Sequence, residues 1–324
     1  MEGVPQSLLD FITGGKKFLI AGHKEPDGDC IGSQFALASA LKRLGKDVIL
    51  LSAGPFKRTE INRYAGQFLS TLDDKEREGA RAVIVDCSEI ERVGEIQNLL
   101  AGLPLAIIDH HATNTSPEGP NGVLFLDPKA PSATFLVTKV IEALGLSLTG
   151  EEAEFLFFGL CTDTGFFRHI DQTGSETFYQ ASRLIAAGAN PKITFNAING
   201  GKSLDSRRLM GLVLARAKPY YGGKLIVSSE KYEETREFGA EGRDSDSLYQ
   251  LFQSVAGVEA IAIIRQEKPD NCTIGLRSRD KVNVAEVALQ FGGGGHKNAS
   301  GITISGIIDD LEPRIIKAFE VQLG

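Results

Sequence analysis

KKFLIAGHKEPDGDCIGSQFALASALKRLG (residues 16–45) is the stretch from which the fold can be argued. It begins with KKFLIAG, a short apolar run of the kind that forms a buried strand. From Cys30 onward apolar residues recur at helical spacing, and Gly45 stands where a helix C-terminal cap is expected. The stretch predicts a strand, a tight acidic turn and a helix, in the order that begins an α/β fold.

Three more apolar runs continue this alternation through the first half of the chain. They are DVILLSA at 47–53, RAVIVD at 81–86 and LAIIDHH at 105–111. Such runs lack a polar face, as do strands that are buried on both sides of a sheet. Helical patterns follow over 132–188. We therefore expect a parallel sheet with helices on both of its faces.

The second half of the chain predicts a smaller α/β domain. A polar stretch with two glycines, NAINGGKSLDSRR at 196–208, precedes a helical run and is interpreted as a linker. Strand patterns at 260–266 and 271–279 and a short helix near 283–291 follow. The expected domains are an N-terminal domain over 1–195, a linker and connecting helix over 196–218, and a second domain over 219–324.

Composition limits the class of protein. The chain has 324 residues and a formal net charge of −7, whereas proteins that bind long duplexes are usually basic. No window holds the roughly 18 apolar residues of a membrane span, and the N-terminus lacks a secretion-signal pattern. The four cysteines form no CxxC pair, so neither a zinc ribbon nor a redox motif is indicated. We expect a cytoplasmic protein that binds neither long duplex nucleic acid nor a membrane.

Acidic and imidazole side chains gather where the predicted strands end. Ligands of an open parallel sheet bind beyond the carboxyl ends of its strands. Buried carboxylates without compensation are costly, so acids that converge there need a cation. The residues concerned are His23, Asp27, Asp29, Asp86, Asp109, His110 and His111, with Asp163 at the end of a helical run.

The kinds of side chain indicate which cation. Carboxylates with a minority of imidazoles and no thiolate pattern suit Mn²⁺ or Mg²⁺ better than structural zinc. Four aspartates and two histidines exceed what one ion needs, so two ions that share a carboxylate are expected. Two such ions activate water and stabilise the leaving oxygen in the hydrolysis of phosphoesters.

Four motifs carry a resemblance to a known family. HKEPDGD (23–29), VIVDCSE (83–89), IDHHATN (108–114) and CTDTGFF (161–167) resemble the motifs of the DHH phosphoesterase superfamily, and FGGGGHKNASG (291–301) resembles the signature of its DHH-associated domain. The resemblance implies that His111 contacts the scissile phosphate or the leaving group, and that Asp109 orients an imidazole. It implies one ion held by His23, Asp27 and Asp86, and a second held by Asp29, Asp86, His110 and Asp163.

The glycine run predicts a substrate-binding site in the second domain. Successive glycines let backbone N–H groups approach a phosphate or a base, although a glycine run alone is usually a flexible loop. Arg277 and Arg279 lie two apart on one predicted strand, and one or both would clamp a terminal phosphate unless that strand face is merely solvated. The other candidates are Gly293, Gly294, Gly295, His296 and Asn298. The triplet SAT at 132–134 fits either a motif near the metals or a helix cap by Ser132.

Within this superfamily the chain resembles the compact two-domain nanoRNase type. That resemblance implies hydrolysis of short RNA, dinucleotides above all, to nucleoside monophosphates, and of 3′-phosphoadenosine 5′-phosphate (pAp) to AMP, with Mn²⁺ preferred and Mg²⁺ as the alternative. It also implies a homodimer as one possible assembly. Other hypotheses are a phosphodiesterase of cyclic or linear dinucleotide second messengers, a pyrophosphate or polyphosphate hydrolase, and an inactive nucleotide sensor, which the complete ligand set disfavours.

Overall fold

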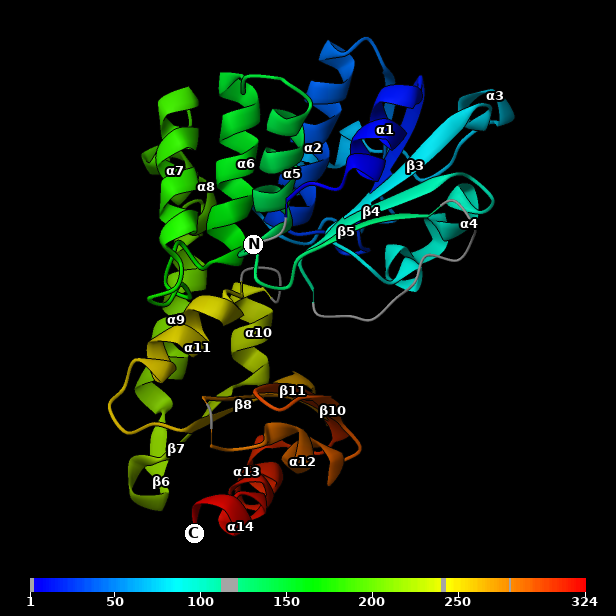
Figure 1. Cartoon of the computed structure of the whole chain (residues 1–324). Coiled ribbons are helices and arrows are strands. Elements are labelled where there is room, and N and C mark those ends of the chain that lie inside the picture. The colour runs from blue at the N-terminus through cyan, green and yellow to red at the C-terminus, as the bar shows by residue number, and fades with distance from the viewer. Residues whose placement is uncertain (1–2, 112–121, 240–242, 280) are drawn as a thin grey trace. The chain divides into compact units, whose positions relative to one another are not determined.

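The computed structural model describes residues 3–111, 122–239, 243–279 and 281–324 (Figure 1). The end of the predicted motif at 108–114 lies outside these residues. The chain divides into two compact units, Met1–Gly201 and Lys202–Gly324, here called the N-terminal and the C-terminal unit.

The N-terminal unit contains the expected parallel sheet. Its strand order is β2-β1-β3-β4-β5, and every neighbouring pair is parallel. The fifth strand is one that the sequence analysis did not predict. The strands are β1 (Lys17–Ala21), β2 (Asp47–Leu51), β3 (Ala80–Val85), β4 (Leu105–Asp109) and β5 (Val123–Leu126).

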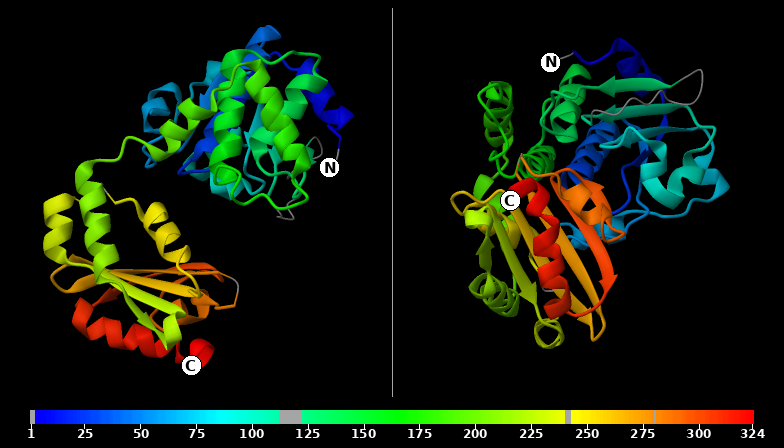
Figure 2. Two further views of the ribbon diagram at one scale, coloured as in Figure 1. Left: turned by 90° about the vertical axis from the view of Figure 1, so that its left-hand side faces the viewer. Right: turned by 90° about the horizontal axis from the view of Figure 1, so that it is seen from below.

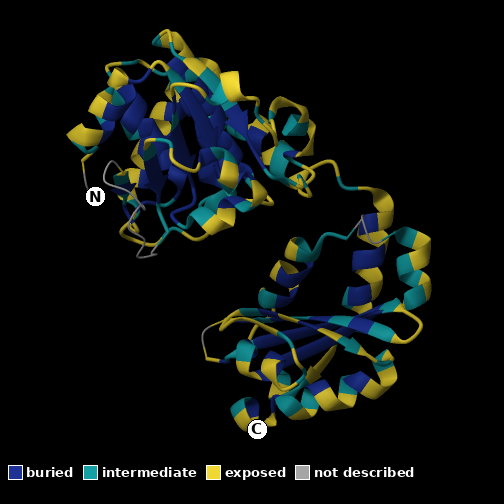
Figure 3. Cartoon of the chain, turned by 90° about the vertical axis from the view of Figure 1, so that its right-hand side faces the viewer, coloured by how far each residue is buried: buried dark blue, intermediate teal, exposed yellow. Residues whose placement is uncertain are grey.

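Helices cover both faces of this sheet, as the apolar strands require. On one face Phe18, Ile20 and Val83 pack in a core with the larger helices, and on the other Leu19 and Ile84 pack with a smaller group. The central strands β1, β3 and β4 are accordingly almost entirely buried, and the middle of the sheet is dark blue in Figure 3. The larger group contains α1 (Gln6–Gly14), α2 (Gly28–Arg43), α5 (Ala133–Ala143), α6 (Gly150–Asp163), α7 (Ser175–Ala187) and α8 (Pro191–Asn199), and the smaller group η2 (Ile90–Ile96) and α4 (Gln97–Leu100). The short elements η1 (Asn62–Gln67) and α3 (Asp74–Arg77) complete the unit.

The stretch predicted as a linker is more ordered than expected. Asn190 caps α8 through its side chain, Pro191 occupies the first turn, and the helix continues to Asn199. A short loop then leads into α9 (Leu204–Arg216), which belongs to the C-terminal unit. The predicted segment 196–218 thus spans the end of α8 and all of α9, and the functional limits of the domains stay a prediction.

The C-terminal unit is built on a mixed sheet of order β10-β11-β9-β8-β7-β6. Only β7 and β8 are parallel. The strands are β6 (Lys218–Tyr220), β7 (Leu225–Glu230), β8 (Ala260–Lys268), β9 (Asn271–Ser278), β10 (Gly294–His296) and β11 (Ala299–Ser305). The helices are α10 (Tyr232–Phe238), α11 (Ser245–Gln253), α12 (Val284–Leu289), α13 (Ile308–Ala318) and α14 (Glu320–Leu323), with η3 (Tyr221–Gly223).

The two faces of this second sheet are covered unequally. Figure 2 shows α13 against one face, where it packs with α12 on all the central strands. On the other face α9 and α11 pack on Ile226, Ile261 and Ile263 of β7 and β8, and no residue of β9 or β11 joins that core. The outward positions of β9 and β11 therefore lie outside that core and leave this part of the face open, apart from Gly275 of β9, on which Tyr249 of α11 rests. Among the described residues, no helix has the length and apolarity that crossing a membrane requires.

Candidate metal centre

The turn after β1 is folded by its own acidic residues. Asp27 caps α2, since its Oδ1 atom accepts hydrogen bonds from the backbone N–H groups of Asp29 and Cys30, both at 3.1 Å. The Nδ1 atom of His23 donates to the Lys24 carbonyl oxygen at 2.9 Å. This bond directs the other ring nitrogen, Nε2, toward Asp27 Oδ1 at 3.8 Å. The turn thus presents an imidazole and a carboxylate on the same side.

Asp86 lies at the centre of the cluster. It directly follows β3 and has a φ of +57°, a left-handed conformation that is uncommon outside glycine. Its Oδ2 atom lies 3.5 Å from His23 Nε2, and its Oδ1 atom lies 3.4 Å from His110 Nε2. This left-handed conformation costs energy, and it places the carboxylate of Asp86 between two imidazoles.

A second group of side chains surrounds His110. Its Nε2 atom lies 3.2 Å from Asp163 Oδ2 and 3.9 Å from Asp29 Oδ2. Asp163 comes from the last turn of α6, and Asp29 from the first turn of α2. The structure thus joins β4 and two helices at the end of the sheet that the sequence analysis predicted.

Asp29 is fixed by the start of α5. Its carboxylate accepts hydrogen bonds from the N–H groups of Ala133 and Thr134 at 2.5 and 2.9 Å, and from the Thr134 hydroxyl at 2.6 Å. Ser132 caps the same helix by accepting from Phe135 N–H at 3.1 Å. The helix cap by Ser132 is therefore confirmed, and Thr134 of the same triplet contacts Asp29, a predicted metal ligand. The role of the two backbone donors was missed, because no side-chain pattern marks a backbone N–H.

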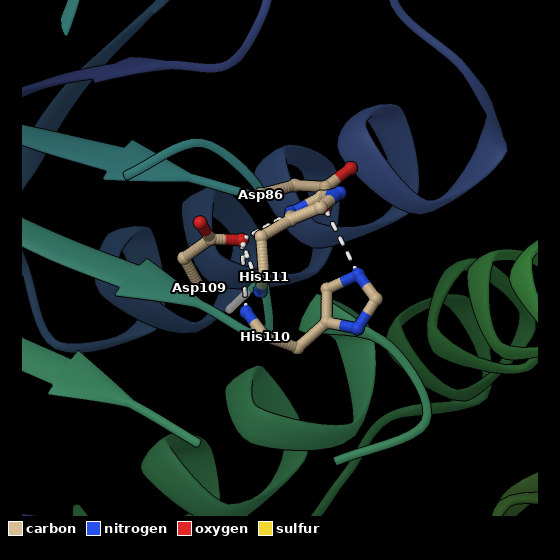
Figure 4. Close-up of side chains that lie close together, drawn as sticks. All are labelled: Asp86, Asp109, His110 and His111. Atoms are coloured by element: carbon tan, nitrogen blue, oxygen red, sulfur yellow. Dashed lines mark hydrogen bonds and ion pairs between the residues drawn. The ribbon is translucent and has the colours of Figure 1, made fainter. Parts of the chain in front are cut away.

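Asp109 orients the two histidines that follow it (Figure 4). The side chain is fully buried, and its Oδ1 atom accepts from the backbone N–H groups of His110 and His111 at 2.8 and 3.2 Å. The same oxygen accepts from His111 Nδ1 at 2.8 Å. A carboxylate held in this way fixes the ring orientation of His111, whose side chain is 37% exposed.

The carboxylates and imidazoles strongly alter one another's protonation. Burial lowers the pKa of His23, but the neighbouring carboxylates of Asp27 and Asp86 outweigh burial and raise it to about 10. The pKa of His110 is likewise raised to about 10, because Asp86 and other carboxylates outweigh burial. Burial and the nearby carboxylates raise the pKa of Asp163 to about 6. Protons on the imidazoles thus supply the positive charge that the acids require.

These side chains are also a set of donors that could hold divalent cations. Asp86 Oδ1 and His110 Nε2 are buried and form no hydrogen bond with any described residue. Within the described chain, the aspartates of the cluster form ion pairs only with histidines. Carboxylate oxygens and imidazole nitrogens suit Mn²⁺ or Mg²⁺. The groups that could hold an ion are Asp86 with Asp109, His110 and His111, Asp29 with His110 and Asp163, and His23 with Asp86 and the buried thiol of Cys30, which the sequence analysis did not include.

The predicted glycine run of the C-terminal unit is part of a strand pair. Gly294–His296 forms β10, which pairs with β11 so that Gly294 lies opposite Gly301. A Cβ atom on Gly293 would lie 2.3 Å from the Gly301 carbonyl oxygen, and one on Gly295, where φ is +141°, would lie 2.6 Å from the Ala299 carbonyl oxygen. Gly293 and Gly295 are therefore required by the close approach of the two strands.

The other predicted binding residues lie in the same part of the C-terminal unit. Arg277, Gly294 and Gly295 line a cavity of about 520 Å³. His296 and Asn298 are exposed, and Asn298 accepts a hydrogen bond from Ser278 N–H at 3.0 Å through its carbonyl oxygen. Arg279 instead donates to the Gln253 carbonyl oxygen at the end of α11. Of the two arginines, Arg277 is the one that lines the cavity.

Aspartates and histidines thus meet at the carboxyl edge of a parallel sheet and could hold a metal ion there, an α/β fold and a set of donors of the kind that metal-dependent hydrolases use. Residues 17–160 match the DHH family, N-terminal domain, and residues 222–323 match the DHHA1 domain. A protein of Thermus thermophilus named bifunctional oligoribonuclease and PAP phosphatase NrnA is 31% identical, over 94% of this chain and 89% of its own length. The chain therefore belongs to the DHH family of phosphoesterases.

Two further similarities extend over nearly the whole chain. Cyclic-di-AMP phosphodiesterase PdeA of Listeria monocytogenes is 24% identical over 98% of this chain and 49% of its own length. The crystal structure of an exopolyphosphatase-related protein from Bacteroides fragilis superposes with a TM-score of 0.81 at 24% identity, covering 98% of this chain and 96% of that one. This structural likeness shows a common fold.

Proposed function

We propose that the protein hydrolyses short RNA oligonucleotides, dinucleotides above all, to nucleoside monophosphates, and pAp to AMP. The observation that carries the proposal is the cluster around Asp86, where carboxylates and imidazoles from the ends of β1, β3 and β4 and from α6 meet and form no ion pair with a lysine or arginine of the described chain. The similarity of the chain to a protein named oligoribonuclease and PAP phosphatase supports this choice of substrate.

The cluster divides into two ion sites in this proposal. His23, Asp27 and Asp86 hold one ion, and Asp29, His110 and Asp163 hold the other together with Asp86, whose two oxygens face different imidazoles. Two divalent ions would activate a water and stabilise negative charge on the phosphate. Mn²⁺ is the proposed metal, and Mg²⁺ is the alternative that the same oxygen-rich donor set accepts.

The chain's own residues orient the reacting groups. His111 is held by Asp109 with its Nδ1 atom turned inward, so that its Nε2 atom, which has no hydrogen-bond partner among the described residues, can donate to the scissile phosphate or the departing ribose oxygen. A donor at that position stabilises the charge that develops as the ester bond breaks. Asp109 acts through His111 and is therefore a positioning residue.

The C-terminal unit binds the distal nucleotide in this proposal. Arg277 contributes a guanidinium for a phosphate, and the backbone at Gly293, Gly294 and Gly295 contributes N–H donors. His296 and Asn298 are exposed and available to phosphate, ribose or base. Recognition by one small site limits the substrate to short chains, which agrees with a net charge of −7.

A dinucleotide second messenger is the second candidate substrate. The similarity to a cyclic-di-AMP phosphodiesterase supports it, although this chain spans only 49% of that protein. Hydrolysis of pyrophosphate or polyphosphate is a third candidate, which would use the metal cluster without base recognition. A cytoplasmic location is also proposed, because four buried free cysteines fit a reducing compartment.

A homodimer is the proposed assembly. Exposed apolar side chains gather on α7 and α8, namely Phe178 (53% exposed), Tyr179 (62%), Ile185 (44%), Ile193 (59%) and Phe195 (49%). A surface of this kind is typical of an interface. Light scattering should give twice the chain mass of 34.9 kDa for the wild type and the single mass for Phe178→Glu.

A competition assay tests the proposed substrates. The purified protein is given Mn²⁺ and an equimolar mixture of an RNA dinucleotide, a 24-nucleotide RNA, pAp and pyrophosphate. Nucleoside monophosphates should appear first from the dinucleotide and AMP from pAp, while the long RNA remains. Faster release of phosphate from pyrophosphate would contradict the proposal, and a cyclic dinucleotide in a parallel reaction distinguishes the second candidate.

A further inference from the structure

The cavity on the open face of the C-terminal sheet has the charge of an anion site. Its lining contains two arginines, Arg265 and Arg277, together with Tyr249, hydroxyl side chains and glycines. No carboxylate is among the described residues that line it. The two arginines differ in their surroundings, and this difference shows which of them is available to a ligand.

Arg265 is neutralised by the protein itself. Its Nε atom lies 3.5 Å from Oε2 of Glu230, and its Nη2 atom donates to the Ser245 hydroxyl at 3.1 Å. Glu230 also pairs with Arg243 at 2.6 Å, and Arg243 pairs with Glu267 at 2.9 Å. Two guanidinium groups therefore balance two carboxylates, and this network has no net charge to offer to a ligand.

Arg277 has no such partner. Its Nη1 atom donates to the Leu276 carbonyl oxygen at 3.0 Å, and no described carboxylate lies within ion-pair distance of it. Its guanidinium lies over the ring of Tyr249, with Cζ 4.6 Å from the ring centroid. A cation on an aromatic face is oriented without being neutralised, so its charge remains available.

Tyr249 is held firmly enough to act as a platform. It comes from α11, is 4% exposed, and packs with Phe252 and Ile263. A Cβ atom on Gly275 would lie 2.0 Å from the tyrosine hydroxyl oxygen, so the end of the ring rests directly on that glycine. Burial raises the pKa of the hydroxyl, which is therefore neutral and does not compensate Arg277.

A second observation points independently to a ligand. Gly294 and Gly301 lie opposite each other in β10 and β11 and line the same cavity. A Cβ atom on either would meet nothing within 4 Å, and neither has a positive φ. The fold therefore does not require glycine at these two positions. Their effect is to leave a bare backbone floor beside Arg277, as a closely approaching ligand needs.

We propose that Tyr249 is a positioning residue that presents the guanidinium of Arg277 to a phosphate of the distal nucleotide, above the floor formed by Gly294 and Gly301. The identity of the ligand as a nucleotide rests on the proposed function. All of these residues belong to the C-terminal unit. An oriented planar guanidinium loses less conformational freedom on binding phosphate than a mobile one does, and this is how Tyr249 would strengthen binding.

Binding of AMP to the full chain without divalent metal tests this proposal. Metal is removed with a chelator, so that the acidic cluster has no ions with which to hold the phosphate. We expect Tyr249→Leu and Arg277→Gln each to weaken AMP binding about tenfold, and the double variant to be no weaker than Arg277→Gln, because both changes remove one unit. Tyr249→Phe keeps the ring and should stay within about twofold.

Adenosine is the matched control ligand, and its binding should not change in any of these variants. AMP affinity unchanged in Tyr249→Leu, additive losses in the double variant, or no AMP binding by the wild type would each overturn the proposal. If Tyr249→Leu does not fold, Arg277→Lys replaces it, because lysine keeps the charge but cannot lie flat on the ring. The measurement needs no turnover, so a failure of the proposed hydrolysis is distinguished from a failure of this subsite.

Discussion

The Oδ1 atom of Asp86 lies 3.4 Å from Nε2 of His110, and neither atom forms a hydrogen bond with any described residue. The two side chains come from adjacent strand ends, after β3 and after β4. Buried polar atoms are normally paired, so two that face each other without a bond mark a place where the protein needs another partner. A shared cation is the partner that both atoms accept.

Asp86→Asn should abolish metal-dependent activity while leaving the fold intact. Asparagine tolerates the left-handed φ of +57°, but it removes the charge that both ion sites share. Hydrolysis should fall by at least about 10²-fold. The melting temperature of the metal-free protein should change little, because the loss of Asp86 removes its repulsion of Asp29 but also its attraction for the protonated imidazoles of His23 and His110. The exposed Asp74→Asn is the control, and a variant that retains half of the activity would contradict the two-ion centre.

Binding of metal should release protons at pH 7. His23 and His110, each with a pKa of about 10, are protonated in the metal-free protein and must lose those protons to become ligands. Calorimetric titration with Mn²⁺ in two buffers of different ionisation enthalpy should give at least about two protons released, one from each histidine, and Asp29, whose pKa burial and Asp86 raise well above its ordinary value, adds to this number. A binding heat that does not depend on the buffer would disprove this coupling.

The same histidines predict how stability depends on pH. Their folded pKa values of about 10 lie above the ordinary value of 6.5, so the stability they contribute is complete below about pH 6.5 and is lost as the pH rises toward 10. The melting temperature of the metal-free protein should therefore fall between pH 7 and 10. Added Mn²⁺ should reduce this fall, because its binding tightens as the imidazoles lose their protons. A melting temperature that stays constant over this range would show that the two imidazoles are not protonated.

Asp109→Asn should change the pH profile of the reaction as well as its rate. The hydrogen bond to Asp109 raises the pKa of His111, so its removal lowers that pKa. If His111 donates a proton, the alkaline limb of the kcat profile moves to lower pH, and kcat falls about 10- to 100-fold. Asp47→Asn, exposed at the start of β2, should change neither quantity. An unmoved limb would remove His111 from the role of donor.

Gly275→Ala and Gly301→Ala should differ in their effect on the free energy of unfolding, although both replace a glycine on the open face of one sheet. A methyl group at Gly275 would lie 2.0 Å from the Tyr249 hydroxyl oxygen, whereas one at Gly301 meets nothing within 4 Å. Gly275→Ala should therefore cost about 1–3 kcal/mol of unfolding free energy. Gly301→Ala should be neutral or slightly stabilising. Urea denaturation measures both, and equal midpoints would show that Tyr249 does not rest on Gly275.

The sequence predicted the features that follow from apolar periodicity. Strands β1 to β4 were found because each is a continuous apolar run, and the acidic residues at their ends then had to meet at one edge of the sheet. Strand β5 was missed because its four residues, VLFL, are too short to stand out. The glycine run was expected as a backbone-lined site but not as a strand, since its pairing with Ala299–Ser305 depends on partners that local patterns do not reveal.

Long-range contacts account for most of what the sequence could not predict. The left-handed backbone at Asp86 has no signature in VIVDCSE, because aspartate also occupies ordinary strand ends. Tyr249 of α11 contacts Gly275 of β9, and no local sequence pattern links these two positions. The difference between Arg277 and Arg265 depends on Glu230, which lies far from both in the sequence.

The hydrogen bonds from Ala133 and Thr134 to Asp29 bear on how the protein is synthesised. They join positions 104 and 105 residues apart, and loops of that length close late and at an entropic cost. A chain still emerging from the ribosome has the acidic turn after β1 long before it has the start of α5. The nascent protein therefore carries an incomplete cluster, and tight capture of metal should wait until nearly all of the N-terminal unit has been made.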